Sequence, residues 1–177
     1  MMGIELWTIG HSTHSADDFV SLLQAQRIEL LADVRQFPGS RRYPHFNREA
    51  LKASLAKAGI GYKHFADLGG RRVPKPNSPN TAWRNDAFRG YADYMTSPEF
   101  DLAINRLATT AAEKRTAVMC AEALWWQCHR GLIADYFKVR GITVWHILPG
   151  GKIEEHPYTS AAQIVNGRLT YAALPLT

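Results

Sequence analysis

Both cysteines of this chain, Cys120 and Cys128, lie in one short segment beside other chemically active side chains. Glu122 follows the first cysteine, and His129 and Arg130 follow the second. A thiol near a cation and a helix start ionises readily and becomes a better nucleophile. A carboxylate in an apolar setting, such as Glu122 near two tryptophans, has a raised pKa that suits acid–base chemistry. We therefore expect catalytic roles for Glu122 and for Cys120, which is expected to be more reactive than Cys128.

Simpler interpretations of this segment stay open. Free cysteines are usually small buried apolar groups, and Glu122 could form an ion pair with Arg130 or Arg35. A reversible disulfide between the cysteines is conceivable, although their spacing is not the Cys-x-x-Cys of redox folds. Cys, His and Glu can also bind zinc, but this spacing fits no common zinc pattern, and the adjacent Cys128 and His129 point apart on one helical turn. No metal site is expected.

Two further clusters could bind or act on an anion. Asp33 and Arg35 end a short apolar run, and Arg41 follows in the same loop. Their guanidinium groups suit phosphate or carboxylate, although Asp33 could simply hold Arg35 in place. After the first apolar run, His11 offers an imidazole and Ser12 a hydroxyl, but a lone histidine more often has a structural role. The candidate anion ligands are Arg35, Arg41, Arg130, His129 and Ser12, and His11 joins Cys120 and Glu122 as a catalytic candidate.

These clusters follow segments whose apolar patterns predict strands and helices. Short apolar or alternating runs predict strands, and apolar residues at helical spacing behind capping residues such as Ser15 and Ser97 predict helices. Residues 67–85 are rich in Gly and Pro and predict a long loop, and the residues after 148 are less regular. The expected strands are 4–9, 30–34, 62–65, 116–121 and 142–147, and the expected helices are 15–28, 47–58, 88–95, 97–112 and 129–140.

The alternation of strands and helices predicts an α/β fold: a single three-layer domain with a mostly parallel sheet of about five strands and helices on both faces. The polar clusters follow strands and so share the carboxyl edge of that sheet. The strand order 3-2-1-4-5 would place the first and fourth strands at the switch point, where ligands bind; the order 2-1-3-4-5 is the alternative. We expect residues 1–148 to form the α/β domain and residues 149–177 to be a C-terminal extension packed on it.

The composition of the whole chain is that of a globular protein. Its 177 residues are 46% hydrophobic and 21% charged, as in an ordinary globular domain. No segment approaches the roughly 18 consecutive apolar residues of a membrane span, and the N-terminus lacks the pattern of a secretory signal. Two cysteines are too few for a disulfide scaffold, so a reduced, cytoplasmic protein without membrane contact is expected.

Positive charge is concentrated in the middle of the chain. Residues 35–89 contain twelve Lys and Arg but only three acidic residues, whereas the rest of the chain contains nine basic and thirteen acidic residues. A basic region on a mildly acidic body indicates a patch that attracts phosphate or another anion. The alternative is that these charges are scattered over unrelated solvated faces.

Taken together, these motifs resemble the domain-of-unknown-function family 488, found in bacteria and archaea. The resemblance spans residues 5–148 and implies a single α/β domain whose candidate site holds the Cys-x-Glu and Cys-His-Arg elements. It implies no reaction, because the family has no assigned activity. The matching stretches are 8–12, 31–35 with Pro38 and Ser40-Arg41, 62–70, Phe88 with 90–94, 119–122 and 128–130.

Three functions remain open. The first is an enzyme that acts on a phosphorylated substrate, most plausibly a nucleotide or nucleic acid, through a Cys/Glu/Arg site at the carboxyl edge of the sheet. The second is a nucleic-acid- or anion-binding module without catalysis, in which the cysteines only pack. The third is a thiol-based redox or sulfur-handling protein. The residues predict no particular cofactor and no oligomeric state.

Overall fold

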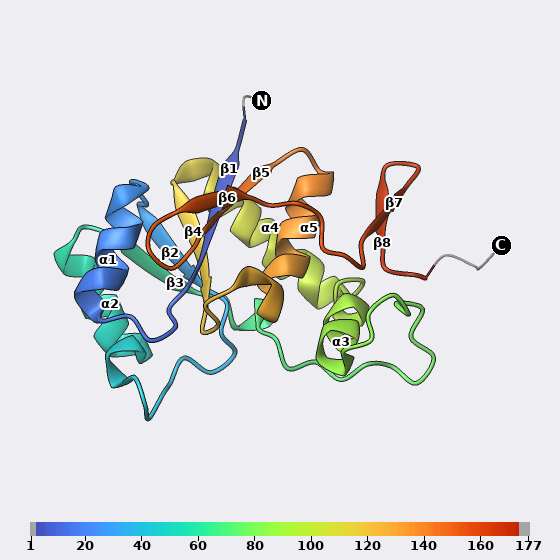
Figure 1. Cartoon of the computed structure of the whole chain (residues 1–177), viewed down its shortest axis with the longest axis horizontal. Helices are drawn as coiled ribbons and strands as arrows, with labels where there is room; N and C mark the ends of the chain where they lie inside the picture. The colour runs from blue at the N-terminus through green and yellow to red at the C-terminus, as the bar shows by residue number, and fades with distance from the viewer. Residues whose placement is uncertain (1–2, 174–177) are drawn as a thin grey trace.

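The computed structural model describes residues 3–173, which form a six-stranded sheet flanked by helices and a separate two-stranded hairpin (Figure 1). The main sheet has the order β3-β2-β4-β1-β5-β6; its first five strands along the chain are parallel, and β6 pairs antiparallel with β5. The strands are β1 (Glu5–Gly10), β2 (Leu30–Asp33), β3 (Gly61–His64), β4 (Thr116–Cys120), β5 (Thr143–Ile147), β6 (Ile153–Glu155), β7 (Gln163–Val165) and β8 (Arg168–Thr170). The α-helices are α1 (Ala16–Ala25), α2 (Arg48–Lys57), α3 (Asp86–Tyr94), α4 (Pro98–Glu113) and α5 (Arg130–Val139), and short 3-10 helices span Pro44–Phe46 (η1), Ala66–Leu68 (η2) and Trp125–Gln127 (η3).

The α/β class and the mainly parallel sheet are confirmed, but both expected strand orders are wrong. β4 lies between β2 and β1 rather than beyond β1. Every residue of β4 is buried, and a strand that is buried on both faces is favoured at the centre of a parallel sheet. The apolar pattern identifies such a strand without encoding its neighbours. The main sheet also has six strands rather than about five, because β6 joins it beyond residue 148.

Helices cover both faces of the sheet (Figure 1). Along β1, Trp7 and Ile9 face a core formed with α1 and α2, whereas Leu6 faces a core formed with α4 and α5. This alternation is the period-two geometry of a strand with two apolar faces. The second core also contains Tyr91 of α3. The two helix layers therefore leave only the ends of the strands open to ligands.

Two of the helices begin at the capping residues that the sequence predicts. The Ser15 hydroxyl accepts a hydrogen bond from the backbone N–H of Asp18 at 3.1 Å, at the start of α1. The Ser97 hydroxyl accepts one from the N–H of Phe100 at 3.2 Å, and Pro98 occupies the first turn of α4. Such caps satisfy N–H groups that have no partner inside the helix. Within residues 3–173, none of the helices combines the length and apolarity needed to cross a membrane.

Candidate functional site

A cleft of about 860 Å³ opens at the carboxyl ends of β1, β2 and β4. Because these three strands are neighbours in the sheet, the loops that follow them converge at one edge, where ligands bind in α/β proteins. The cleft is completed by α3 and by the residues that precede α5. Of the residues expected at the site, those that line the cleft are His11, Ser12, Arg35, Cys120, Glu122 and His129.

The two cysteines meet at the floor of this cleft. Cys120 is the last residue of β4, and Cys128 lies between η3 and α5. Their side chains are 3% and 8% exposed, and their Sγ atoms are 2.7 Å apart as free thiols. Both residues line the cleft. The structure thus brings together two thiols that are eight residues apart in sequence.

Arg130, the first residue of α5, contacts both sulfurs from within the core. Its Nε lies 3.0 Å from Sγ of Cys120 and 3.2 Å from Sγ of Cys128. Its Nη1 donates to the Thr8 hydroxyl at 3.2 Å, and its Nη2 donates to the Glu122 carbonyl oxygen at 2.7 Å. Arg130 is 1% exposed and pairs with no carboxylate in residues 3–173. A guanidinium stays charged in a protein, so among its contacts only the sulfurs can supply a compensating negative charge.

These contacts give the two thiols opposite pKa shifts. Burial opposes ionisation of Cys128, but the hydrogen bond from Cys120 and the charge of Arg130 outweigh it and hold the pKa of Cys128 well below its ordinary value. The backbone N–H of Arg130, at the start of α5, also points to Sγ of Cys128 at 3.4 Å. Burial and the neighbouring Cys128 raise the pKa of Cys120 well above its ordinary value. Both shifts favour ionisation of Cys128 over ionisation of Cys120.

The Glu122 side chain does not lie in the environment that the sequence predicts for it. Its side chain is exposed at the cleft, not enclosed by the tryptophans, and it pairs with neither Arg130 nor Arg35. The backbone carbonyl of Glu122, rather than its carboxylate, accepts the hydrogen bond from Arg130. This carbonyl packs directly on Gly10 at the end of β1, where an added Cβ would lie 1.7 Å from it. The expectations of an apolar setting and of an ion pair for Glu122 are both wrong, because the loop after β4 turns its side chain outward.

The turn after β1 places a neutral imidazole at the cleft. His11 is buried and stacks on Phe46, with ring centroids 4.5 Å apart. Its Nδ1 is 3.0 Å from the carbonyl oxygen of Ser12. Burial lowers the pKa of His11 to about 4, so the ring is neutral at pH 7. Backbone hydrogen bonds from His11 and Ser12 to the carbonyls of Cys120 and Ala121, both 2.9 Å, tie this turn to the thiol loop.

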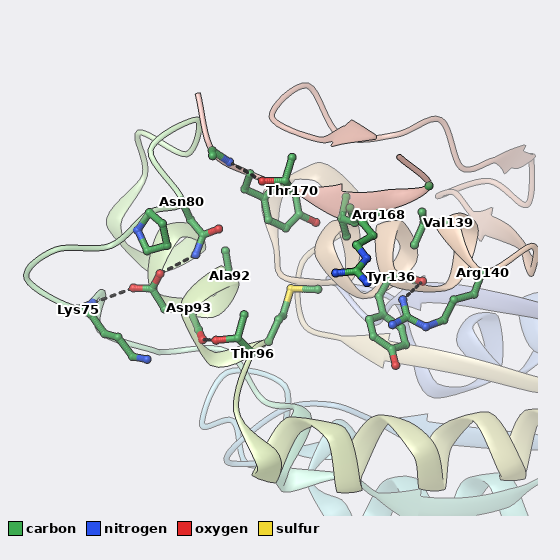
Figure 2. Close-up of a pocket in the computed structure, with 16 residues that line it drawn as sticks. Lys75, Asn80, Ala92, Asp93, Thr96, Tyr136, Val139, Arg140, Arg168 and Thr170 are labelled. Carbon is green, nitrogen blue, oxygen red and sulfur yellow. Dashed lines mark hydrogen bonds between the residues drawn. The ribbon is translucent and has the colours of Figure 1, made fainter. Parts of the chain in front are cut away.

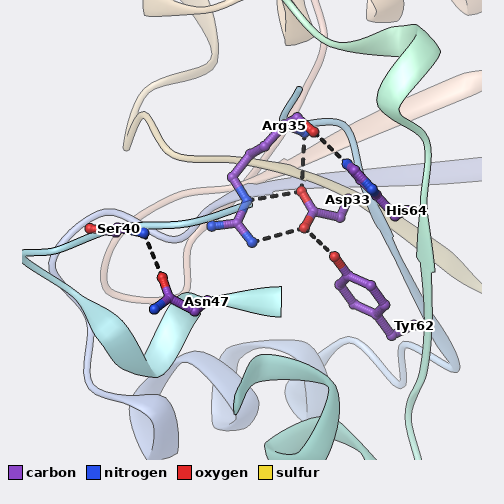
Figure 3. A network of polar contacts seen from close by, with 6 residues as sticks. All are labelled: Asp33, Arg35, Ser40, Asn47, Tyr62 and His64. Atoms are coloured by element: carbon purple, nitrogen blue, oxygen red, sulfur yellow. Dashed lines mark hydrogen bonds and ion pairs between the residues drawn. The ribbon is translucent and has the colours of Figure 1, made fainter. Parts of the chain in front are cut away.

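Arg35 is held at the cleft by an ion pair, as one of its two sequence interpretations proposed. Its Nε and Nη2 donate to the two carboxylate oxygens of Asp33 at 2.9 and 2.8 Å (Figure 3). Tyr62 donates a further hydrogen bond to Asp33, and the Nε2 of His64 lies 2.7 Å from the carbonyl oxygen of Arg35. Arg41, by contrast, is exposed and does not line the cleft, whereas its neighbour Arg42 does.

His129 is also held by the fold. Its Nε2 lies 3.0 Å from the carbonyl oxygen of Val34, and its ring packs against Tyr91 at 5.1 Å. Gly70 passes close to the other side, where a Cβ would lie 3.1 Å from Nδ1 of His129. Burial lowers the pKa of His129, which favours a neutral ring. The contacts of His129 thus connect the end of β2, α3 and the start of α5 at the wall of the cleft.

Comparison with known protein families matches residues 15–137 to the domain of unknown function DUF488. The chain belongs to this family. The DUF488 match contains the dithiol, Arg35 and Arg130, but it is shorter at both ends than the resemblance over residues 5–148. His11 and Ser12 lie outside the matched span, as do all residues after α5. Neither the curated proteins nor the solved structures include a match to the chain.

A second cavity, of about 720 Å³, lies on the far side of α3, against α5 and the β7–β8 hairpin (Figure 2). It contains the cations Lys75, Arg140 and Arg168 but no cysteine or histidine. Its carboxylate, Asp93, is already bound by the N–H of Lys75 at 2.8 Å and by the side chains of Ser78 and Asn80. These contacts anchor the loop that precedes α3. The thiol cleft, not this cavity, therefore holds the candidate chemistry of the DUF488 protein.

Sequence reasoning missed three residues that shape the thiol site. Thr8 and His146 are fully buried polar residues within otherwise apolar strands, and Thr8 contacts Arg130 directly. Their signal was a polar side chain at a core position of β1 and of β5, which requires a buried partner. The third is Gly10, which admits the Glu122 backbone. Among residues 3–173, no cluster of three or more His, Cys, Asp and Glu side chains could hold a metal ion.

Proposed function

We propose that this protein is a thiol-dependent enzyme that acts on an anionic, phosphate-bearing substrate such as a nucleotide, with Cys128 as its nucleophile. The observation that carries the proposal is the contact of the buried Arg130 with both sulfurs, at 3.0 and 3.2 Å. A guanidinium in this position stabilises a thiolate before any substrate arrives. The proposal moves the nucleophile from Cys120, the expected thiol, to Cys128, where the contacts lower the pKa.

The charges around the cleft support an anionic substrate. Arg35, Arg42 and Arg71 line it, and Glu122 is its one acidic lining residue. A cationic cleft with low-dielectric walls concentrates anions. In the proposed reaction, the Cys128 thiolate donates its electron pair to the electrophilic atom, and the leaving group departs with its own pair. Water then attacks the group bound to Cys128 while the neutral His11 accepts a proton from that water; the bond to sulfur breaks and the Cys128 thiolate is restored.

The reactive thiol can be identified from the pH dependence of alkylation. Because the contacts lower the pKa of Cys128, its thiolate persists below the ordinary thiol pKa of about 8.5. We expect the rate of iodoacetamide alkylation to rise with pH through an inflection at least about one unit below that value, with mass spectrometry assigning the product to Cys128. Cys120 should react only at much higher pH. If neither cysteine reacts until the protein unfolds, the cysteines only pack, and a non-catalytic anion-binding module becomes the better account.

Anion binding is tested by titrating the protein with inorganic phosphate in a calorimeter. Arg42→Ala and Arg71→Ala remove two cations that line the cleft. Exposed charge pairs contribute about 0.2–1 kcal/mol, so each variant should weaken the affinity up to about fivefold. Arg168→Ala, in the second cavity, is the matched control and should leave the affinity unchanged. Weaker binding in the control alone would place the anion in the second cavity.

A dithiol redox reaction is the second candidate, favoured by the 2.7 Å separation of the sulfurs. In it, the Cys128 thiolate attacks a substrate disulfide and releases one substrate thiolate. The Cys120 thiol then attacks the mixed disulfide, forming the Cys120–Cys128 disulfide and releasing the second substrate thiol. Cys120→Ser separates the two candidates. Disulfide reduction would stop at the mixed disulfide, whereas a single-nucleophile enzyme would keep most of its Cys128 reactivity.

A further inference from the structure

Beneath the thiol site, a chain of buried polar groups connects Arg130 to Asp135. Arg130 donates to the Thr8 hydroxyl at 3.2 Å, and that hydroxyl lies 2.5 Å from Nδ1 of His146. The Nε2 of His146 is 2.8 Å from Nδ1 of His156, whose Nε2 is 2.7 Å from the Asp135 carboxylate. Each of the five side chains is at most 1% exposed. Arg130 and Asp135 both belong to α5, so the hydrogen bonds and the helix together close a ring. We call these five side chains the buried circuit.

One arrangement of hydrogens satisfies every link of the buried circuit. Arg130 can only donate, so the Thr8 oxygen accepts its N–H, and in this arrangement the Thr8 hydrogen points to Nδ1 of His146. His146 then donates from Nε2 to His156, and His156 donates from Nε2 to Asp135. Burial lowers the pKa of His146 to about 2, which agrees with one proton on that ring. Trp125 stacks on His146 at 4.7 Å and fixes its plane.

The C-terminal segment fixes the far end of the buried circuit. Besides the contact from His156, the Asp135 carboxylate accepts hydrogen bonds from the N–H and hydroxyl of Thr159 at 2.9 and 2.5 Å. The Tyr171 hydroxyl donates a further one at 2.8 Å. His156, Thr159 and Tyr171 all follow β5 and lie outside the span matched to DUF488. Residues after the matched domain therefore determine how the Thr8 hydroxyl is oriented, and through it where Arg130 lies.

We infer that Thr8, His146 and His156 are positioning residues that hold the guanidinium of Arg130 against the two thiols. The inference rests on the proposed function, since it takes Cys128 as the reactive thiol. A guanidinium is a rigid plane, so fixing Nη1 at Thr8 and Nη2 at the Glu122 carbonyl sets the direction of Nε. Without the Thr8 contact the plane can rotate, and Nε leaves its place between the sulfurs. The C-terminal segment is thereby part of the thiol site.

The test compares Thr8→Val, which removes the hydroxyl at nearly constant volume, with Thr8→Ser, which keeps it. Alkylation of Cys128 by iodoacetamide is followed across pH in the full chain. We expect the inflection to move up by about one unit in Thr8→Val, which lowers the rate at acidic pH about tenfold. Thr8→Ser should restore the wild-type profile. Thr116→Val is the matched control, because it removes a buried hydroxyl of β4 that bonds only to the Lys114 carbonyl.

The outcomes separate this inference from the proposed function. A folded Thr8→Val protein with an unchanged inflection would overturn the positioning role while leaving the thiolate of Cys128 intact. A wild-type protein without a low inflection would remove the proposed function itself. If Thr8→Val does not fold, His156→Phe breaks the buried circuit two links away and keeps an aromatic ring beside Trp125. It should also move the inflection for Cys128 alkylation to higher pH. An unchanged pH profile in that variant would equally overturn the inference.

Discussion

Replacing Arg130 with methionine will raise the pKa of the Cys128 thiol and slow its alkylation at neutral pH. Arg130 is the cation in direct contact with the two sulfurs, and it is almost fully buried, so water screens its charge little. An opposite charge at this distance lowers a pKa by about 1–3 units. Its loss should therefore reduce the thiolate fraction, and the alkylation rate at pH 7, by about tenfold to a thousandfold. The pH dependence of iodoacetamide alkylation gives the inflection directly.

Two further variants show whether this effect comes from the charge at the sulfurs. Arg130→Lys keeps the charge but cannot reach Thr8 and the Glu122 carbonyl together, so an intermediate inflection is expected. Arg115→Met removes a guanidinium that packs on Trp7 at 3.8 Å, away from the thiols, and should leave the inflection unchanged. If Cys128 in folded Arg130→Met still reacts as in the wild type, Arg130 does not stabilise its thiolate.

Gly10→Ala should destabilise the protein more than any other single-methyl change in the sheet. The new Cβ would overlap the carbonyl oxygen of Glu122, at 1.7 Å, and its carbonyl carbon, at 2.6 Å. Both atoms belong to the backbone, so no side-chain rotation relieves the overlap, and the loop after β4 must move. Overpacking of a core typically costs about 1–3 kcal/mol and occasionally more, and we expect the upper end here. Urea unfolding followed by circular dichroism measures the loss in the free energy of unfolding.

Gly61→Ala is the matched control for this change. Gly61 also lies in a parallel strand of the sheet, but its Cβ would make ordinary contact with Leu30 at 3.6 Å. We expect it to change the free energy of unfolding by less than about 1 kcal/mol, within the usual effect of a glycine-to-alanine exchange. If Gly10→Ala still folds, the displaced Glu122 carbonyl no longer holds Arg130 in place. The inflection for Cys128 alkylation should then move to higher pH. Equal free energies of unfolding for the two variants would mean that the Glu122 backbone does not restrict the side chain at position 10.

The sequence predicted the strands and helices before residue 148 and the edge of the sheet that carries the site, because both depend on local patterns; the short strands β6, β7 and β8 were not predicted. Apolar runs such as Ala117–Met119 identify strands, and capping residues such as Ser97 fix where helices begin. Polar residues that follow parallel strands necessarily meet at the carboxyl edge. His11, Arg35 and Cys120 therefore line one cleft even though the expected strand order was wrong.

The features that the sequence could not predict all depend on pairing in three dimensions. The apolar composition of β4 indicates a buried strand but does not specify that β2 and β1 are its neighbours. The lowered pKa of Cys128 depends on its contacts with Cys120, with the Arg130 charge and with the backbone N–H at the start of α5. Nothing local indicated that His156, far along the chain, would connect to Arg130 through Thr8.

The buried cation at the sulfurs has a consequence for the reduction potential of the pair. Formation of a Cys120–Cys128 disulfide would consume the thiolate and leave Arg130 without an anionic contact in the protein interior. That cost falls on the oxidised form alone, since a disulfide carries no charge. Stabilisation of the reduced form makes a dithiol couple more oxidising. Any disulfide at this position would accordingly be easily reduced, and added small thiols would return the pair to its dithiol state.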